Sequence, residues 1–322
     1  MQRFRILLVL CAANSFAPTP AMAQDNPCLR RSVPLSFVVP PGTTAPQITV
    51  ADLRGKIAGK PVQLLSLAAD DRPHRIVIIL DGSGSMRAVW EREIGIAAAL
   101  VAIRAPKLEF ALLFFGSSNS KTIDFSKGQT AVQAWLNLVQ LEIEKSRTLA
   151  YGPSAIYDWT LTGLDLIHSP TSADALFLLS DGDDNSSDHK WKDVTTRFES
   201  AGVRLFFVGL SEDDPVARYG EKYSKSTWVA LARSSGGDVV RVRLPRSSRK
   251  RAADQPTNES LNWYYTEAVA NLRLELELPE LLKAPKSWEL KLVGLNREPW
   301  KGMRLVYPPQ LAPCPNGQPL RP

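Results

Sequence analysis

The stretch Arg75–Met86, RIVIILDGSGSM, decides the fold of this chain. Its first half is a short apolar run from Ile76 to Leu80, rich in β-branched residues, which is typical of a strand buried on both faces. Such strands belong to parallel sheets that are covered by helices. The stretch therefore predicts an α/β fold, a doubly wound, mostly parallel sheet with helices on both faces.

The second half of the stretch is a polar turn at the carboxyl end of this strand. Asp81, Ser83 and Ser85 bring one carboxylate and two hydroxyls together, and Gly82 and Gly84 let the backbone bend tightly. Open α/β sheets bind their ligands at this end of the strands. Mg²⁺ prefers about six oxygen ligands at about 2.1 Å. Because one turn cannot fill that shell, further ligands must come from other loops.

Two later stretches place oxygen ligands where loops of the sheet could reach the same edge. Ser154, in YGPSAIYD, precedes a predicted helix, and Asp181, in LFLLSDGDDN, follows another apolar strand. Together with the turn, this order resembles the metal-ion-dependent adhesion site of the von Willebrand factor type A (VWA) domain, written DxSxS, then Thr, then Asp. The resemblance covers about Arg75 to Leu272, and Ser154 replaces the Thr but keeps its hydroxyl. The phrase SDGxDxSS at Ser180–Ser187 is shared with bacterial secreted members of the family.

The resemblance implies protein binding through a metal ion rather than catalysis. In VWA domains, the hydroxyls contact the ion directly and the two aspartates act mainly through water, so that a Glu or Asp of a protein partner completes the coordination. The ion expected here is Mg²⁺, with Mn²⁺ or Ca²⁺ as alternatives. The expected ligands are Asp81, Ser83, Ser85, Ser154 and Asp181. Two simpler interpretations remain, a turn that binds no metal and Ser154 as the N-cap of its helix.

Two other functions stay open from the sequence. Asp81, at a strand end, could be the nucleophile of a magnesium-dependent phosphate-ester hydrolase, although Ser83 stands where that chemistry uses a second Asp. The chain could also be a structural scaffold with a vestigial metal site. Zinc and nucleotide-phosphate signatures are absent, because the three histidines are dispersed and no CxxC, HExxH, GxxxxGK[ST] or GxGxxG pattern occurs.

Residues 1–23 have the pattern of a secretory signal peptide. Arg3 and Arg5 precede an apolar core, Ile6–Ala13, and the small-residue site Ala21-Met22-Ala23 follows. The apolar core is shorter than the ~20 residues that span a bilayer. We therefore expect an exported protein, periplasmic or secreted, without a transmembrane anchor. After cleavage Cys28 and Cys314 remain, and they either pair in the oxidising compartment or stay as two free thiols.

The segments on either side of the α/β region have the character of strands. Leu272–Leu278 alternates leucine with charged residues, which predicts a half-exposed antiparallel strand. Further strands are expected over Ser36–Val39, Ile48–Leu53, Val62–Leu67, Trp288–Val293 and Met303–Tyr307. Either flank alone has too few strands to bury an apolar face, so we expect both to form one small antiparallel β-sandwich. The predicted domains are a β-domain made of residues 24–74 and 272–322, with a VWA domain at 75–271 inserted.

Within the inserted region, strands and helices are expected to alternate. The predicted strands cover Lys107–Gly116, Thr122–Phe125, Ala175–Leu179, Val203–Val208 and Val239–Val242. The predicted helices cover Gln129–Lys145, the segment after Ser154, Trp191–Ser200, Ser226–Ser234 and Ser260–Asn271.

The formal net charge of +6 is too small to indicate binding to nucleic acid. One basic cluster could contact an anionic surface, although such clusters also occur as solvated loops. It consists of Arg241, Arg243, Arg246, Arg249, Lys250 and Arg251.

Overall fold

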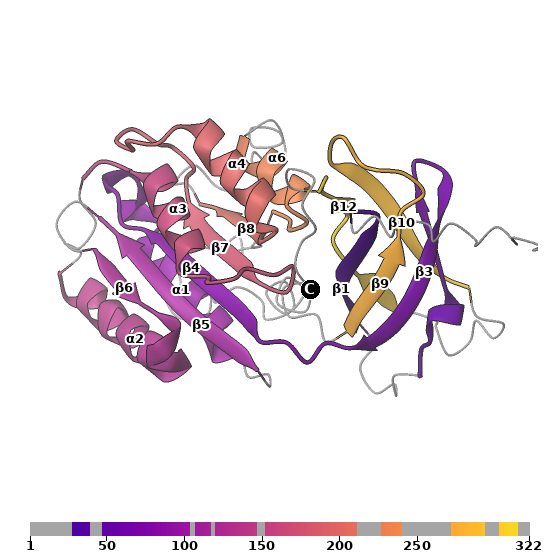
Figure 1. The fold of residues 1–322 in the computed structure, drawn as a ribbon. Coiled ribbons are helices and arrows are strands. Elements are labelled where there is room, and N and C mark those ends of the chain that lie inside the picture. The colour runs from indigo at the N-terminus through magenta and orange to yellow at the C-terminus, as the bar shows by residue number, and fades with distance from the viewer. Residues whose placement is uncertain are drawn as a thin grey trace, which may run out of the picture.

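The structure is a computed structural model, and it describes residues 28–38, 47–103, 107–116, 120–146, 152–210, 227–239, 272–293 and 303–314. These residues form two units that lie side by side, each built around its own sheet (Figure 1). The predicted signal peptide, the basic cluster from Arg241 to Arg251 and the predicted helix Ser260–Asn271 lie outside the described residues.

The first unit, the α/β unit, contains a five-stranded sheet in the order β6-β5-β4-β7-β8. Its strands are β4 (His74–Asp81), β5 (Leu108–Phe115), β6 (Lys121–Ile123), β7 (Ala175–Ser180) and β8 (Arg204–Gly209). The central strand β4 pairs in parallel with β5 and β7, and β8 pairs in parallel with β7. Only β6, at one edge, is antiparallel. Every residue of β4 from Ile76 onward is buried, as its apolar sequence predicts.

Helices cover both faces of this sheet. One face packs against α1 (Trp90–Ala102) and α2 (Gly128–Ser146), and the other against α3 (Ile156–Asp165), α4 (Trp191–Ala201) and α6 (Thr227–Ser234). The side chains of β4 alternate between the two layers: Ile76 and Ile78 belong to the first apolar core, Val77 and Ile79 to the second. Among the described residues, no helix has the length and apolar character needed to cross a membrane.

The elements predicted for this unit agree with the structure within two residues at each end where they fall on described residues. Of the predicted strand Val239–Val242, only Val239 is described, and it forms an isolated parallel bridge with Phe207. The helix α1 and the short 3-10 helix η2 (Gly84–Ala88) before it were not predicted.

The second unit, the β unit, is a seven-stranded antiparallel sheet in the order β11-β1-β9-β3-β2-β10-β12. The N-terminal flank supplies β1 (Arg30–Val38), β2 (Leu53–Ile57) and β3 (Lys60–Ala69), and the C-terminal flank supplies β9 (Leu272–Glu277), β10 (Lys286–Leu292), β11 (Arg304–Val306) and β12 (Gln310–Leu311). Because β9 lies between β1 and β3, the flanks share one sheet. Its division into the two layers of a sandwich stays a prediction, as do the domain boundaries.

The predicted strand Ile48–Leu53 is wrong. Val50–Asp52 form the 3-10 helix η1, and β2 begins only at Leu53. The Asp52 carboxylate accepts hydrogen bonds from the backbone amide and the hydroxyl of Thr49, at 2.9 and 2.8 Å. This capping-box arrangement stabilises a turn, and it outweighs the strand tendency of the neighbouring β-branched residues.

The β unit meets the α/β unit near the amino ends of the parallel strands. Ser172, just before β7, donates a hydrogen bond to the carbonyl of Ser32 in β1 at 3.3 Å, and α6 lies against β12. The chain also enters β4 from β3 on this side (Figure 1). The carboxyl end of β4, with the polar turn that follows it, therefore faces away from the β unit.

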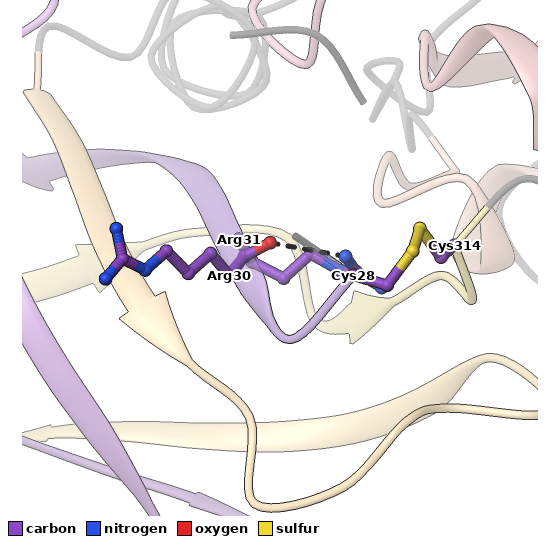
Figure 2. Close-up of a disulfide and its surroundings, with 4 residues drawn as sticks. All are labelled: Cys28, Arg30, Arg31 and Cys314. Carbon is purple, nitrogen blue, oxygen red and sulfur yellow. Dashed lines mark hydrogen bonds between the residues drawn. A yellow bond between two sulfur atoms is a disulfide. The ribbon is translucent and has the colours of Figure 1, made fainter. Parts of the chain in front are cut away.

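A disulfide joins Cys28, just before β1, to Cys314, just after β12 (Figure 2). The two Cα atoms are 5.6 Å apart, although 286 positions separate the residues in the sequence. The paired alternative is thus confirmed over two free thiols. The bridge ties together the two ends of the described β unit.

Removing this bridge is expected to destabilise the protein, because the unfolded chain then gains the freedom that the closed loop denies it. For the variant Cys28→Ser/Cys314→Ser we expect the free energy of unfolding to fall by up to about 5 kcal/mol. Urea unfolding of the oxidised protein, the reduced protein and the double variant measures this. Equal unfolding midpoints for all three, or two free thiols titrated in the denatured chain that lacks residues 1–23, would contradict the bridge.

His74, at the start of β4, is a buried histidine. Its side chain is in the interior, and its Nδ1 atom has no hydrogen-bond partner among the described residues. Burial lowers the pKa of the imidazole from its usual 6.5; Asp70 opposes this, whereas Arg204 and Arg72 act in the same direction. The folded protein therefore favours the neutral ring.

The lowered pKa of His74 predicts a specific pH dependence. A histidine that stays neutral in the folded protein lowers the free energy of unfolding when the pH falls below about 6.5. Below that pH the histidine of the unfolded chain binds a proton that the folded protein does not bind, whereas above it neither state is protonated. His74→Gln should lose less stability than the wild type between about pH 7.5 and about pH 5.5. Urea midpoints at the two pH values test this, and an equal loss in both proteins would refute it.

Candidate metal centre

The polar turn after β4 is held tightly against its neighbours. The amide of Gly82 donates to the carbonyl of Phe115 at the end of β5, at 2.6 Å, and the amide of Gly84 donates to the carbonyl of Gly152, at 3.1 Å. A Cβ atom on Gly82 would lie 2.3 Å from the ring of Phe114 and 2.6 Å from the carbonyl oxygen of Phe115. Only glycine fits at this position, so the glycine of the motif permits a close approach of backbones.

Asp81 is the centre of the site. Its side chain is fully buried, and its two oxygens receive hydrogen bonds from different parts of the chain. Oδ1 accepts from the amide of Ser83 at 3.0 Å, and Oδ2 accepts from the hydroxyl of Ser180 at 2.6 Å. The hydroxyl of Ser154 reaches the same Oδ2 over a longer distance of 3.5 Å. One carboxylate thus connects the turn after β4, the end of β7 and the start of the α3 region.

The predicted hydroxyl ligands lie around this carboxylate. Ser83 Oγ and Ser85 Oγ are 3.1 Å apart, and Ser83 is buried whereas Ser85 is exposed. Ser154 is buried, and the N-cap position of α3 is occupied by Ala155, without a side-chain hydrogen bond. The interpretation of Ser154 as an N-cap is therefore wrong, and its hydroxyl is directed to Asp81 instead.

Asp181 follows directly after β7 and is half-buried. Its Oδ1 accepts a hydrogen bond from the amide of Asp183 at 3.1 Å, and its charge acts on Asp81. Four of the five predicted residues, Asp81, Ser83, Ser85 and Ser154, are thus linked through side-chain and backbone hydrogen bonds, and the fifth is within electrostatic reach of Asp81.

The site brings acidic groups together in a buried place. Burial raises the pKa of Asp81 to about 6, although the hydrogen bonds from Ser180 and Ser83 lower it; the charge of Asp181 raises it further. Glu93 in α1 lies directly behind Asp81, and its Oε1 accepts the backbone amide of Asp81 at 2.7 Å. Burial, and then the Asp81 charge, hold the pKa of Glu93 well above its usual range. A cation at this place would favour the ionised form of Asp81.

The donor set fits a hard cation. In an octahedron with metal–oxygen distances of about 2.1 Å, neighbouring ligand oxygens lie about 3.0 Å apart. The two hydroxyl oxygens of Ser83 and Ser85, 3.1 Å apart, match this spacing. Within the described part of the chain, no group of three or more His, Cys, Asp or Glu side chains could hold a metal. Three of the five predicted ligands, Ser83, Ser85 and Ser154, are hydroxyls.

The sequence did not identify the residues that hold the loop after β7 in place. Asn185 Oδ1 accepts the amide of Ser154 at 2.8 Å, and the amide of Asn185 donates back to the carbonyl of Ser154 at 2.9 Å. Ser187 Oγ accepts the amides of Tyr157 and Asp158, at 3.1 and 3.2 Å, and so caps α3 from another loop. Ser180 and Ser187 are fixed positions of the phrase SDGxDxSS, and Asn185 is its second variable position. The segment Ser180–Ser187 therefore connects two loops of the site.

Trp228 of α6 holds the other side of this loop. Its Nε1 donates to the carbonyl of Gly182 at 3.1 Å. Gly182 has φ +85, and a Cβ atom there would lie 3.1 Å from the indole ring. The loop that carries Asp181 is thus fixed between α3 and α6.

Comparison with known proteins gives likenesses in structure only. No family model and no curated protein matches the chain. One solved structure that resembles it is a VWA domain. This is the SpRpn10 VWA domain, 12% identical, with 59% of this chain and 94% of that chain covered and a TM-score of 0.37. An aerotolerance-related membrane protein from Bacteroides fragilis is 14% identical, with 60% and 98% covered and a TM-score of 0.42. Manganese-loaded TRAP protein from Plasmodium vivax is 16% identical, with 75% and 94% covered and a TM-score of 0.40.

The capping role of Ser187 can be tested separately from any metal. Ser187→Ala removes the acceptor of the Asp158 amide and one of the two acceptors of the Tyr157 amide, the other being Asp184 Oδ1 at 3.4 Å. We expect a loss of about 1 kcal/mol in the free energy of unfolding. The neighbouring Ser186 is exposed and serves as a matched control, for which Ser186→Ala should change stability by less than about 0.5 kcal/mol. Equal effects of the two substitutions in urea unfolding would disprove the capping role.

Proposed function

We propose that this chain is an exported protein-binding module that recognises an acidic residue of a partner protein through a divalent cation. The residues that would hold the cation are Asp81, Ser83, Ser85, Ser154 and Asp181. The single observation that supports this most strongly is the pair of hydroxyl oxygens 3.1 Å apart beside a fully buried carboxylate. Mg²⁺ fits this spacing, and Mn²⁺ is an alternative of similar coordination chemistry.

The donors are suited to binding a further anionic ligand. Three of the five are neutral hydroxyls, so a bound divalent cation would keep much of its positive charge and offer a coordination position to a Glu or Asp of the partner. Such a charge-assisted contact, surrounded by an ordinary interface, gives specificity. The exposed Ser85 and the orientation of the turn away from the β unit support access from outside. The signal-like N-terminal sequence and the disulfide support an extracytoplasmic location.

Two rival functions make different demands on the same residues. In a phosphate-ester hydrolase with Asp81 as the nucleophile, a carboxylate oxygen must touch the phosphorus. The side chain of Asp81 is 0% exposed and both its oxygens accept hydrogen bonds, which favours binding over catalysis. In a scaffold with a vestigial site, partner binding would not respond to chelation. Contact of the basic cluster from Arg241 to Arg251 with an anionic surface, and the lack of a nucleic-acid partner, remain predictions.

Magnesium should stabilise the folded protein, because a ligand that binds only the native state raises the free energy of unfolding. At a concentration of 100 times the dissociation constant, the gain is about 2.7 kcal/mol. We expect Mg²⁺ to raise the melting temperature by several degrees, and Asp81→Ala or Ser85→Ala to abolish this rise. Asp183→Asn, which changes an exposed acid in the same loop, is the matched control and should keep it. A wild type whose melting temperature ignores both Mg²⁺ and Mn²⁺ would exclude the proposed cation site.

Partner recovery and turnover separate the three functions. Immobilised protein should retain a partner from an extracellular extract in Mg²⁺, release it on chelation, and fail to retain it as the Ser85→Ala variant. Incubation with an aryl phosphate and Mg²⁺ should give no hydrolysis above that of Asp81→Asn. Chelator-independent recovery would favour the scaffold, and hydrolysis that Asp81→Asn removes would favour the enzyme.

A further inference from the structure

We propose that Glu93 is a positioning residue of the metal centre, which fixes the backbone of Asp81 and thereby the direction of its carboxylate. This inference rests on the proposed function. Glu93 lies in the first turn of α1, twelve positions after Asp81, and no feature of the motif singles it out. Its role is visible only in its contacts in the folded structure.

The backbone of Asp81 needs an acceptor that the sheet does not provide. The pairing of β4 with β7 ends at Leu80 and Leu179, one residue before Asp81, whereas the pairing with β5 continues to Asp81 and Phe115. The amide of Asp81 is buried and donates to Glu93 Oε1 at 2.7 Å. A buried amide without a partner would cost free energy, so this bond fixes the strand end at the point where the carboxylate must turn toward Ser83, Ser154 and Ser180.

A residue that only filled space here would be apolar. Glu93 is 0% exposed and lies on the same buried face of α1 as Trp90, Ile94 and Ala97, which belong to the apolar core. Its second oxygen, Oε2, has no hydrogen-bond partner within the described part of the chain. A buried carboxyl group with one unsatisfied oxygen is costly, and such groups in native structures call for a functional explanation. The position of Glu93 behind Asp81 gives one.

The location in α1 makes the arrangement rigid. The amide of Glu93 donates to the carbonyl of Val89 at 3.0 Å, so its backbone is part of the first helical turn. The turn before it is fixed by the bond from the Met86 amide to the Ser83 carbonyl at 3.1 Å. The chain therefore forms a closed loop from Asp81 through Ser83 and Met86 to Glu93 and back to Asp81. Partners of this kind, behind the ligands, typically change metal affinity by 10- to 100-fold.

Two conservative variants separate the reach of the side chain from its charge. Glu93→Gln keeps the length and the acceptor Oε1 but removes the acid. Glu93→Asp keeps the acid but withdraws the acceptor by one methylene. The control is Thr160→Val in α3, because Thr160 is also fully buried and its hydroxyl also has no partner among the described residues. None of these positions is one of the proposed ligands.

The first readout is the apparent Mg²⁺ dissociation constant, obtained from the dependence of the melting temperature on the Mg²⁺ concentration, together with the melting temperature of the metal-free protein. If Glu93 positions Asp81, Glu93→Asp raises that dissociation constant about 10-fold or more, whereas Glu93→Gln and Thr160→Val stay within about threefold of the wild type. A merely structural role would lower the metal-free melting temperature without changing the Mg²⁺ dissociation constant. Wild-type Mg²⁺ affinity in Glu93→Asp, or equal losses in Glu93→Asp and Glu93→Gln, would overturn the inference.

The second readout needs no metal. Hydrogen exchange of the assigned Asp81 amide, followed by NMR in the metal-free protein, should be slow in the wild type and Glu93→Gln and faster in Glu93→Asp. Equal exchange in all three proteins would overturn the positioning role. If the wild type does not respond to Mg²⁺ at all, the proposed function fails, and this exchange measurement still decides whether Glu93 holds Asp81.

Discussion

The burial of one carboxylate, Asp81, is the constraint on which the candidate site depends. Its oxygens are reached by hydroxyls from residues 73 and 99 positions away in the sequence, Ser154 and Ser180, and by the amide of Ser83. Burial makes its negative charge unfavourable, and the nearby charge of Asp181 increases that cost. Hydroxyl donors offset only part of it. A divalent cation at the hydroxyls of Ser83 and Ser85 would offset the rest of the cost of the buried Asp81 charge. The electrostatics at the carboxyl end of β4 thus support the proposed function.

The two sheets have separate tasks in this account. The parallel sheet brings the ends of β4 and β7 to one edge, and the helices on both faces fix the loops that follow: α1 through Glu93, α3 through the cap from Ser187, and α6 through Trp228. The antiparallel sheet contains strands from both flanks of the sequence, and the disulfide joins the two ends of this unit. Because it lies near the amino ends of the parallel strands, the described part of the β unit does not cover the edge with the candidate site.

Much of the fold could be predicted from the sequence, because the pattern of apolar residues in a strand matches the way the folded protein buries that strand. The apolar run before Asp81 and the alternation in Leu272–Leu278 each specify how a strand is buried, and both strands are present. The prediction at Ile48–Leu53 was wrong, since the hydrogen bonds that Thr49 donates to the Asp52 carboxylate decided the local structure. The supporting residues Ser180, Asn185, Ser187 and Glu93 could not be found in this way. Their roles depend on which loops meet in space, and periodicity and motif spacing contain no such information.

The most direct test of the central claim is anomalous diffraction from crystals of the protein grown or soaked in Mn²⁺. We expect one strong anomalous peak within bonding distance of the hydroxyl oxygens of Ser83 and Ser85, near Ser154, and no such peak in crystals of Ser85→Ala. Wild-type crystals that show no anomalous density at this place in ample Mn²⁺, with the turn after β4 well ordered, would contradict it.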